Sequence, residues 1–173
     1  MLKAIKKVGF YALGAGLFFT GLARFHVKLH EFAMRQIQRA AQAGSEKALL
    51  LMGQILVYRG ASEYNRVAGV TYLQDLVASY DPQIGDSKVF AQACFLLAEA
   101  YENPELVVVK NAADHSIQSS AHLYLKAAEC GHIMAALRLS KAYKNGTLGL
   151  AKDSVLAEQW MTTFLQASKH HDQ

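Results

Sequence analysis

The chain of 173 residues is long enough for one domain with an appendage, and its 52% hydrophobic and 18% charged residues exclude an intrinsically disordered protein. Its net charge of +4 is N-terminal, because residues 1–40 carry a net +6 (seven Lys or Arg, one Glu) and residues 41–173 a net −2 (11 against 13). A domain with a net charge of −2 lacks the excess of positive charge that binding a phosphate backbone requires, so we predict no nucleic-acid partner.

The first predicted element is an apolar helix that we expect to span a membrane. Residues 8–23 (VGFYALGAGLFFTGLA) carry no charge, three lysines precede them, and Arg24 and Lys28 follow. As a helix they cover roughly 24 Å, a little less than the roughly 30 Å hydrocarbon core, and flanking cations extend this length by reaching the headgroups. Two alternatives stay open: a signal peptide cleaved after Ala23, and a buried core helix.

One side of this segment is lined by small residues, which suits close packing against a second membrane helix. Ala12 and Gly16 are four residues apart, and Gly9 adds to the smooth side. We predict that these three residues contact helices of other membrane proteins, and that Arg24 and Lys28 lie beside lipid headgroups. Because cations lie on both sides of the segment, the rule that positive charge stays on the cytoplasmic side gives little preference for either orientation. The side of the membrane that carries the domain therefore stays open, and we prefer the periplasmic side of a bacterial inner membrane.

Two later stretches share one pattern. Residues 39–60 (RAAQAGSEKALLLMGQILVYRG) and 126–146 (KAAECGHIMAALRLSKAYKNG) each run from a cation through Ala-Ala and a Gly into an apolar stretch. Gly44 and Gly131 stand where one helix must end and the chain turn back, a left-handed position that glycine fills without strain. Ser45 is then expected to cap the following helix.

Aromatic residues mark the length of the repeat. Tyr72, Tyr124 and Trp160 each follow a small residue by three positions in the first helix of a pair, and Tyr101 and Tyr143 occupy second helices. A small residue one turn before a large ring lets two helices cross closely, so we expect all five rings in the core. The pattern predicts helices over residues 3–42, 46–58, 64–79, 88–102, 116–130, 133–145 and 154–168.

The predicted fold class is therefore all-α. A membrane anchor over residues 1–30 precedes a repeat domain over 31–173, in which about three helix pairs and a closing helix form a short α-α superhelix.

Residues 121–160 resemble the Sel-one-like repeats, relatives of the tetratricopeptide repeats. The resemblance is weaker over residues 34–60 and 64–102, and it implies a protein-interaction scaffold, often a bacterial envelope or signalling adaptor, without a catalytic centre. The matching positions are Ala121, Tyr124, Lys126, Ala127, Ala128, Gly131, Ala135, Tyr143, Gly146, Gly149, Asp153, Ala157 and Trp160.

The stretch 143–153 (YKNGTLGLAKD) is predicted to be a turn between helices rather than a phosphate-binding loop. A P-loop has four residues between its glycines, Lys-Ser/Thr directly after them and a strand in front. Here two residues separate Gly146 from Gly149, and a helix precedes them. Asp153 or Ser154 is expected to cap the last helix.

Two insertions into the repeat are expected to carry partner specificity. The spacing between aromatic landmarks is extended within residues 79–90 and 103–120, where turn-forming residues and Pro104 interrupt the helices. These loops are what the chain adds to a generic repeat, so we place the partner contacts there. The predicted contact residues are Asp81, Ile84, Leu106, Val108 and Lys110.

Neither a catalytic set nor a metal or cofactor site is predicted. His26 and His30 have the spacing of metal ligands, but only Glu31 lies nearby and off their face, and Cys94 and Cys130 are expected to be free thiols. We predict a non-enzymatic, membrane-anchored scaffold subunit of a bacterial envelope complex that binds other proteins and lipid but no small-molecule substrate. The alternative is a soluble periplasmic or secreted repeat protein released by signal cleavage.

Overall fold

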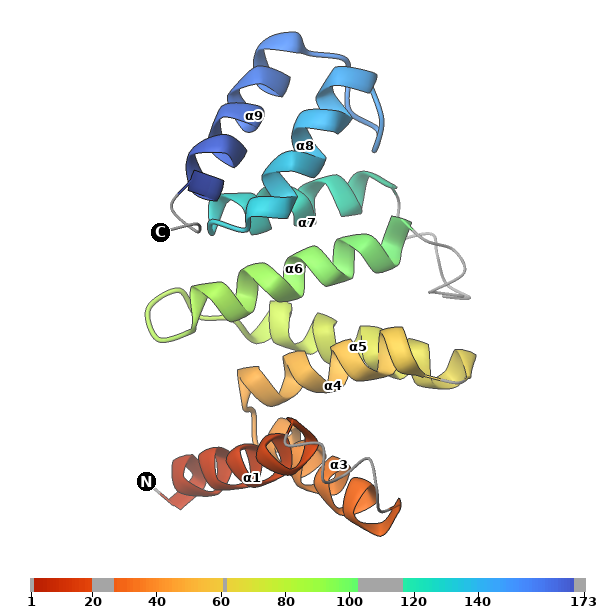
Figure 1. The fold of residues 1–173 in the computed structure, drawn as a ribbon, viewed down its shortest axis with the longest axis vertical. Helices are drawn as coiled ribbons and strands as arrows, with labels where there is room; N and C mark the ends of the chain where they lie inside the picture. The colour runs from red at the N-terminus through yellow and green to blue at the C-terminus, as the bar shows by residue number, and fades with distance from the viewer. Residues whose placement is uncertain (1, 20–26, 61, 103–116, 170–173) are drawn as a thin grey trace.

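A computed structural model describes residues 2–19, 27–60, 62–102 and 117–169, and every regular element within these ranges is an α-helix. The helices are α1 (Leu2–Phe19), α3 (Val27–Gln42), α4 (Glu46–Arg59), α5 (Glu63–Ser79), α6 (Ser87–Glu102), α7 (Ile117–Glu129), α8 (Ile133–Asn145) and α9 (Ser154–Lys169). They stack in chain order into an elongated array, with α1 near one end and α9 at the other (Figure 1). The all-α repeat class is confirmed, and from residue 46 onward the predicted helix boundaries hold within one residue.

The N-terminal part differs from the prediction of one helix over residues 3–42. α1 and α3 are separate helices that pack on each other at the end of the array (Figure 1). Among the described residues, none of the helices combines the length and apolarity that crossing a bilayer requires. The membrane-spanning helix predicted over 8–23 is thus not found, because α1 holds three lysines among its 18 residues; residues 20–23 lie outside the described ranges.

Small residues bring α1 close to α3. A Cβ atom on Gly14 would lie 2.7 Å from Cγ1 of Ile37 and 2.8 Å from the carbonyl oxygen of Ala33. Ala15, beside it, is buried. Any side chain at position 14 would therefore force the two helices apart.

A second close crossing joins α4 to α5. A Cβ on Gly69 would lie 2.7 Å from the backbone nitrogen of Val57, and a Cβ on Gly53 would lie 2.6 Å from Cδ2 of Leu73. Gly69 is the small residue three positions before Tyr72, so the predicted role of this position in helix crossing is confirmed.

Two helix ends close with the same backbone motif. Gly44 and Gly131 have φ angles of +81° and +84°. The amide of the residue after each glycine donates to a carbonyl five positions back, over 3.0 Å and 2.9 Å respectively, which satisfies carbonyls at the helix end. The predicted left-handed caps are confirmed. Ser45 does occupy the N-cap position of α4, but its side chain makes no capping hydrogen bond.

The stretch 143–153 is a tight turn between α8 and α9. Gly146 and Gly149 both have φ angles of +71°, and the Asp153 amide donates to the carbonyl of Tyr143 over 3.0 Å. The Asp153 carboxylate accepts from the amides of the second and third residues after it, over 2.9 and 3.0 Å. The predicted turn and the cap by Asp153 are confirmed.

The aromatic landmarks lie at different depths of one continuous core. Tyr124 is 1% exposed and belongs to the core itself. Tyr72, Tyr101, Tyr143 and Trp160 are half-buried and pack against the margin of the core. Alanines and leucines, rather than these rings, make up most of the buried side chains.

Candidate functional site

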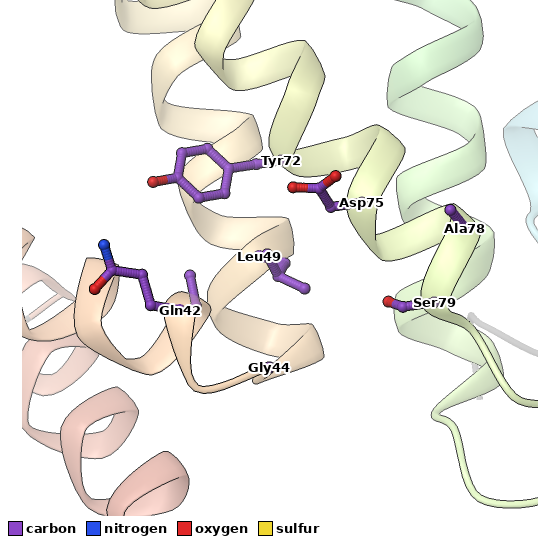
Figure 2. Close-up of a pocket in the computed structure, with 8 residues that line it drawn as sticks. Gln42, Gly44, Leu49, Tyr72, Asp75, Ala78 and Ser79 are labelled. Carbon is purple, nitrogen blue, oxygen red and sulfur yellow. The ribbon is translucent and has the colours of Figure 1, made fainter.

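A hollow lies where the end of α3, the turn into α4 and the second half of α5 meet (Figure 2). Its volume is about 510 Å³. The left-handed turn at Gly44 sends α4 back against α5, and α3 has no extensive contact with α5, so this space stays open. The lining residues are Ala41, Gln42, Gly44, Leu49, Tyr72, Asp75, Ala78 and Ser79.

A second hollow of about 430 Å³ continues the first along α5. Both are lined by Tyr72 and Asp75, so we treat them together as the α5 groove. From Tyr64 to Ser79 the lining positions follow one face of the helix over roughly 22 Å. The residues that line the second hollow are Tyr64, Val67, Ala68, Thr71, Tyr72 and Asp75.

The α5 groove combines aromatic, apolar and acidic groups. Tyr64 is 82% exposed, an unusual position for a large ring. Figure 2 shows the ring of Tyr72, the carboxylate of Asp75 and the amide of Gln42 around the same open space. The Asp75 carboxylate is exposed and has no hydrogen bond or ion pair with any residue that the structure describes. The exposed ring of Tyr64 and the half-buried ring of Tyr72, beside one unpaired carboxylate, suit a protein segment that carries apolar side chains and a cation.

The predicted partner-binding loop between α5 and α6 is well braced. The rings of Tyr80 and Phe90 stack with their centroids 3.9 Å apart, and Oδ1 of Asp81 accepts the amide of Gln83 over 2.9 Å. Ile84 is 87% exposed in this loop and is free to contact a partner. The Asp81 carboxylate instead accepts a hydrogen bond from within the loop. The other predicted contact residues, Leu106, Val108 and Lys110, lie outside the described residues.

The predicted membrane contacts point away from the packed side of α1. Gly9, Ala12 and Gly16 are exposed, and nothing lies within 4 Å of a Cβ placed on either glycine. Gly14 makes the close approach to α3 instead. Lys28 is exposed on α3, and Arg24, like His26, lies outside the described residues.

Cys94 and Cys130 are both free, as predicted. Cys94 is buried in α6, and this burial raises the pKa of its thiol to about 12. The thiol is therefore protonated at neutral pH and is not a nucleophile. Cys130, in the turn directly after α7, is half-buried.

Solved structures resemble the chain although its sequence matches no protein-family model and no curated protein. A Sel1 repeat protein from Oxalobacter formigenes aligns with a TM-score of 0.59 over 76% of this chain and 88% of that protein, at 21% sequence identity. The chain has a Sel1 repeat fold. The resemblance predicted from residues 121–160 is confirmed at the level of the fold.

Within this Sel1 repeat fold, the groove is the feature that the sequence reasoning missed. The aromatic pattern predicts Tyr72 in the core, whereas its ring is half-buried and borders the groove. A signal was present, since Tyr64, Ala68, Tyr72, Asp75 and Ser79 recur at helical spacing. This spacing does not by itself predict a groove, because the groove also requires the separation between α3 and α5.

Proposed function

We propose that the chain is a non-enzymatic protein-binding module whose α5 groove holds a segment of a partner protein. One observation carries this proposal: the half-buried ring of Tyr72 and the unpaired, exposed carboxylate of Asp75 line both hollows of the groove. The Sel1 repeat fold supports it, because such arrays use extended surfaces for binding.

The dimensions and charge of the groove define the class of partner segment. About 22 Å accommodates roughly six or seven extended residues or four helical turns. A Lys or Arg on the segment would pair with Asp75, while apolar side chains would contact Tyr64 and Val67. Loss of a partly desolvated charge pair and an aromatic anchor is expected to weaken binding strongly.

Membership in a bacterial envelope complex remains part of this proposal. The cationic N-terminal segment, net +6 over residues 1–40, supports it, as does the resemblance of residues 121–160 to the Sel-one-like repeats, which often occur in bacterial envelope or signalling adaptors. A segment of another subunit of that complex would be the occupant of the groove.

A peptide-display selection tests the proposal directly. Random peptides selected on the full chain should converge on sequences with one Lys or Arg near apolar residues. Asp75→Lys and Tyr72→Ala should each weaken the selected peptides at least about tenfold, and Asp75→Lys should accept peptides whose cation is replaced by Glu. Glu158→Lys, an equal charge reversal at an exposed position of α9, is the matched control and should change nothing.

Two outcomes would contradict the proposal. Peptides that bind Tyr72→Ala and Asp75→Lys as tightly as the wild type occupy another surface. Peptides that lose affinity to Ile84→Glu but not to the groove variants would instead place the site on the loop between α5 and α6, where Ile84 is the exposed apolar residue.

A further inference from the structure

α3 carries an exposed stripe of positive charge. The members of the stripe are spaced four, three, four and three residues apart, which places them along one face of the helix, opposite the buried Ala33 and Ile37. Phe32, which is 39% exposed, lies among the cations. We call this face the α3 stripe; it consists of Lys28, Phe32, Arg35, Arg39 and Gln42.

The three cations of the α3 stripe are exposed, and none of them forms an ion pair within the ranges that the structure describes. Glu31 is the one acidic residue of α3, so the helix keeps an excess of positive charge. Cations around an exposed aromatic ring favour a partner surface that offers both a carboxylate and other rings.

The α5 groove offers this combination. It contains the unpaired carboxylate of Asp75 and the rings of Tyr64 and Tyr72. From Lys28 to Gln42 the α3 stripe is about 21 Å long, which matches the roughly 22 Å of the groove. The two surfaces are therefore complementary in length and in charge.

The α3 stripe and the α5 groove meet at Gln42. This residue ends the stripe and also lines the groove, where its amide borders the same open space as the ring of Tyr72 (Figure 2). Within one chain the stripe does not fill the groove, because α3 has no extensive contact with α5. One copy thus presents a cationic and an acidic surface next to each other, which is the self-complementary arrangement that a two-fold symmetric dimer requires.

We infer that the α3 stripe of a second copy of this chain occupies the α5 groove, and that two copies do this reciprocally. The inference rests on the proposed function, because it names the partner of the same groove. Arg35 and Arg39 of each copy lie beside the Asp75 carboxylate of the other, and Phe32 lies against the tyrosine rings. The net charge of +4 does not prevent this contact, because salt screens charges separated by more than about 8 Å, whereas the paired groups touch.

The size of the contact predicts a weak dimer. A helix about 10 Å wide covers roughly 200 Å² over a length of about 21 Å, so the two reciprocal contacts bury roughly 400 Å² per copy. A standard interface buries about 800 Å² per partner. The dimer should therefore dissociate on dilution.

Sedimentation velocity of the full chain between about 2 and 200 µM tests the inference. The chain should show a monomer–dimer equilibrium that shifts to monomer when salt is raised from about 0.05 M to about 0.5 M. The double variant Arg35→Glu, Arg39→Glu and the single variant Asp75→Lys should each raise the dissociation constant at least about tenfold. Lys141→Glu with Lys144→Glu, an equal charge reversal at exposed positions of α8, is the matched control and should dimerise like the wild type.

An equimolar mixture of the two groups of variants tests the reciprocal arrangement. Arg35→Glu, Arg39→Glu alone and Asp75→Lys alone each set like charges against each other. In a mixed dimer the reversed stripe faces the reversed groove, and the native stripe faces the native groove. The mixture should therefore form a dimer at least about tenfold tighter than either variant alone, which also shows that both variants are folded.

A chain that stays monomeric up to about 200 µM, or a dimer that neither charge reversal weakens, would overturn the inference. If peptides selected on the groove still bind such a chain, the proposed function holds and only the identity of the partner is wrong. A monomer whose binding to phosphatidylglycerol vesicles is lost in Arg35→Glu, Arg39→Glu would also overturn the inference, because lipid would then be the partner of the α3 stripe.

Discussion

The guanidinium of Arg138 in α8 donates two hydrogen bonds, of 3.2 and 2.7 Å, to the carboxylate of Glu102 at the end of α6. The pair joins helices that are not consecutive in the chain and so couples one repeat to the next. On the same helix α6, Glu99 accepts the hydroxyl of Tyr58 from α4 over 2.7 Å. Two carboxylates one turn apart therefore connect α6 to both of its second neighbours.

Removing the Arg138–Glu102 pair is expected to destabilise the array. Both side chains are partly exposed, so Glu102→Gln should lower the free energy of unfolding by about 1–2 kcal/mol, measured by urea denaturation. A double-mutant cycle with Arg138→Met should give a coupling of about 1 kcal/mol. Lys47→Ala breaks a longer, exposed ion pair of 3.8 Å with Asp86 and should cost less than about 0.5 kcal/mol. Additive single variants would show that the pair does not couple the repeats.

The stability of the chain should fall in mild acid because of His132. Its Nδ1 accepts the amide of Ala135 over 3.3 Å, its Nε2 lies 3.1 Å from Oε1 of Gln92, and its ring stacks on Phe95 with a centroid distance of 4.2 Å. Burial lowers the pKa of His132 below its ordinary value of 6.5. Between that lowered pKa and 6.5 the unfolded chain binds more protons than the folded chain, so the free energy of unfolding falls as pH decreases.

The variant His132→Asn isolates this effect. Asparagine retains an oxygen that caps α8 but carries no titrating group. Melting temperatures measured from pH 7.5 to 5 should therefore decline less steeply for the variant than for the wild type. Parallel profiles would mean that His132 is not responsible for the loss.

Gly69→Ala should disrupt the crossing of α4 and α5. The new Cβ would lie 2.7 Å from the backbone nitrogen of Val57, which cannot move without moving the helix. We expect a loss of about 2–3 kcal/mol in the free energy of unfolding, despite the better helix propensity of alanine. Gly16→Ala is the matched control, because nothing lies within 4 Å of its Cβ, and it should stabilise the chain by roughly 0.5–1 kcal/mol.

Ser140→Ala should loosen the contact between α8 and α9. The buried hydroxyl of Ser140 donates to the carbonyl of Ala157 over 2.8 Å. Its loss should cost about 1 kcal/mol, seen in urea denaturation and in faster hydrogen exchange of α9 amides. Thr163→Ala removes an exposed hydroxyl that bonds within its own helix, and exchange as fast in this control as in Ser140→Ala would contradict the prediction.

Local signals in the sequence were sufficient for the repeats. Gly44 and Gly131 predicted the turns because only a left-handed residue ends a helix in that way, and Asp153 predicted the start of α9 because its carboxylate caps free amides. These features depend on residues within one turn of each other. The fold class and most helix boundaries followed from them.

The N-terminal hairpin and the groove depend on contacts that local signals do not contain. Residues 8–16 of α1 carry no charge on either side, and a sequence pattern does not distinguish a lipid environment from the surface of α3. Gly14, which makes the close approach, is one of several small residues in that stretch. The α5 groove exists because α3 and α5 stand apart, which is a relationship between residues such as Gln42 and Asp75 that lie far apart in the sequence.

The caps at Gly44 and Gly131 have a consequence for the sequences that can form this fold. Both helix ends are closed by backbone hydrogen bonds alone, and the positive φ angle of each turn favours glycine. The neighbouring side chains take no part in these hydrogen bonds. The direction in which each helix leaves its turn therefore depends on one glycine rather than on the neighbouring side chains. The similarity of this fold to the Sel1 repeat protein, with a TM-score of 0.59 at 21% identity, illustrates that the same helix arrangement can be built from largely different residues.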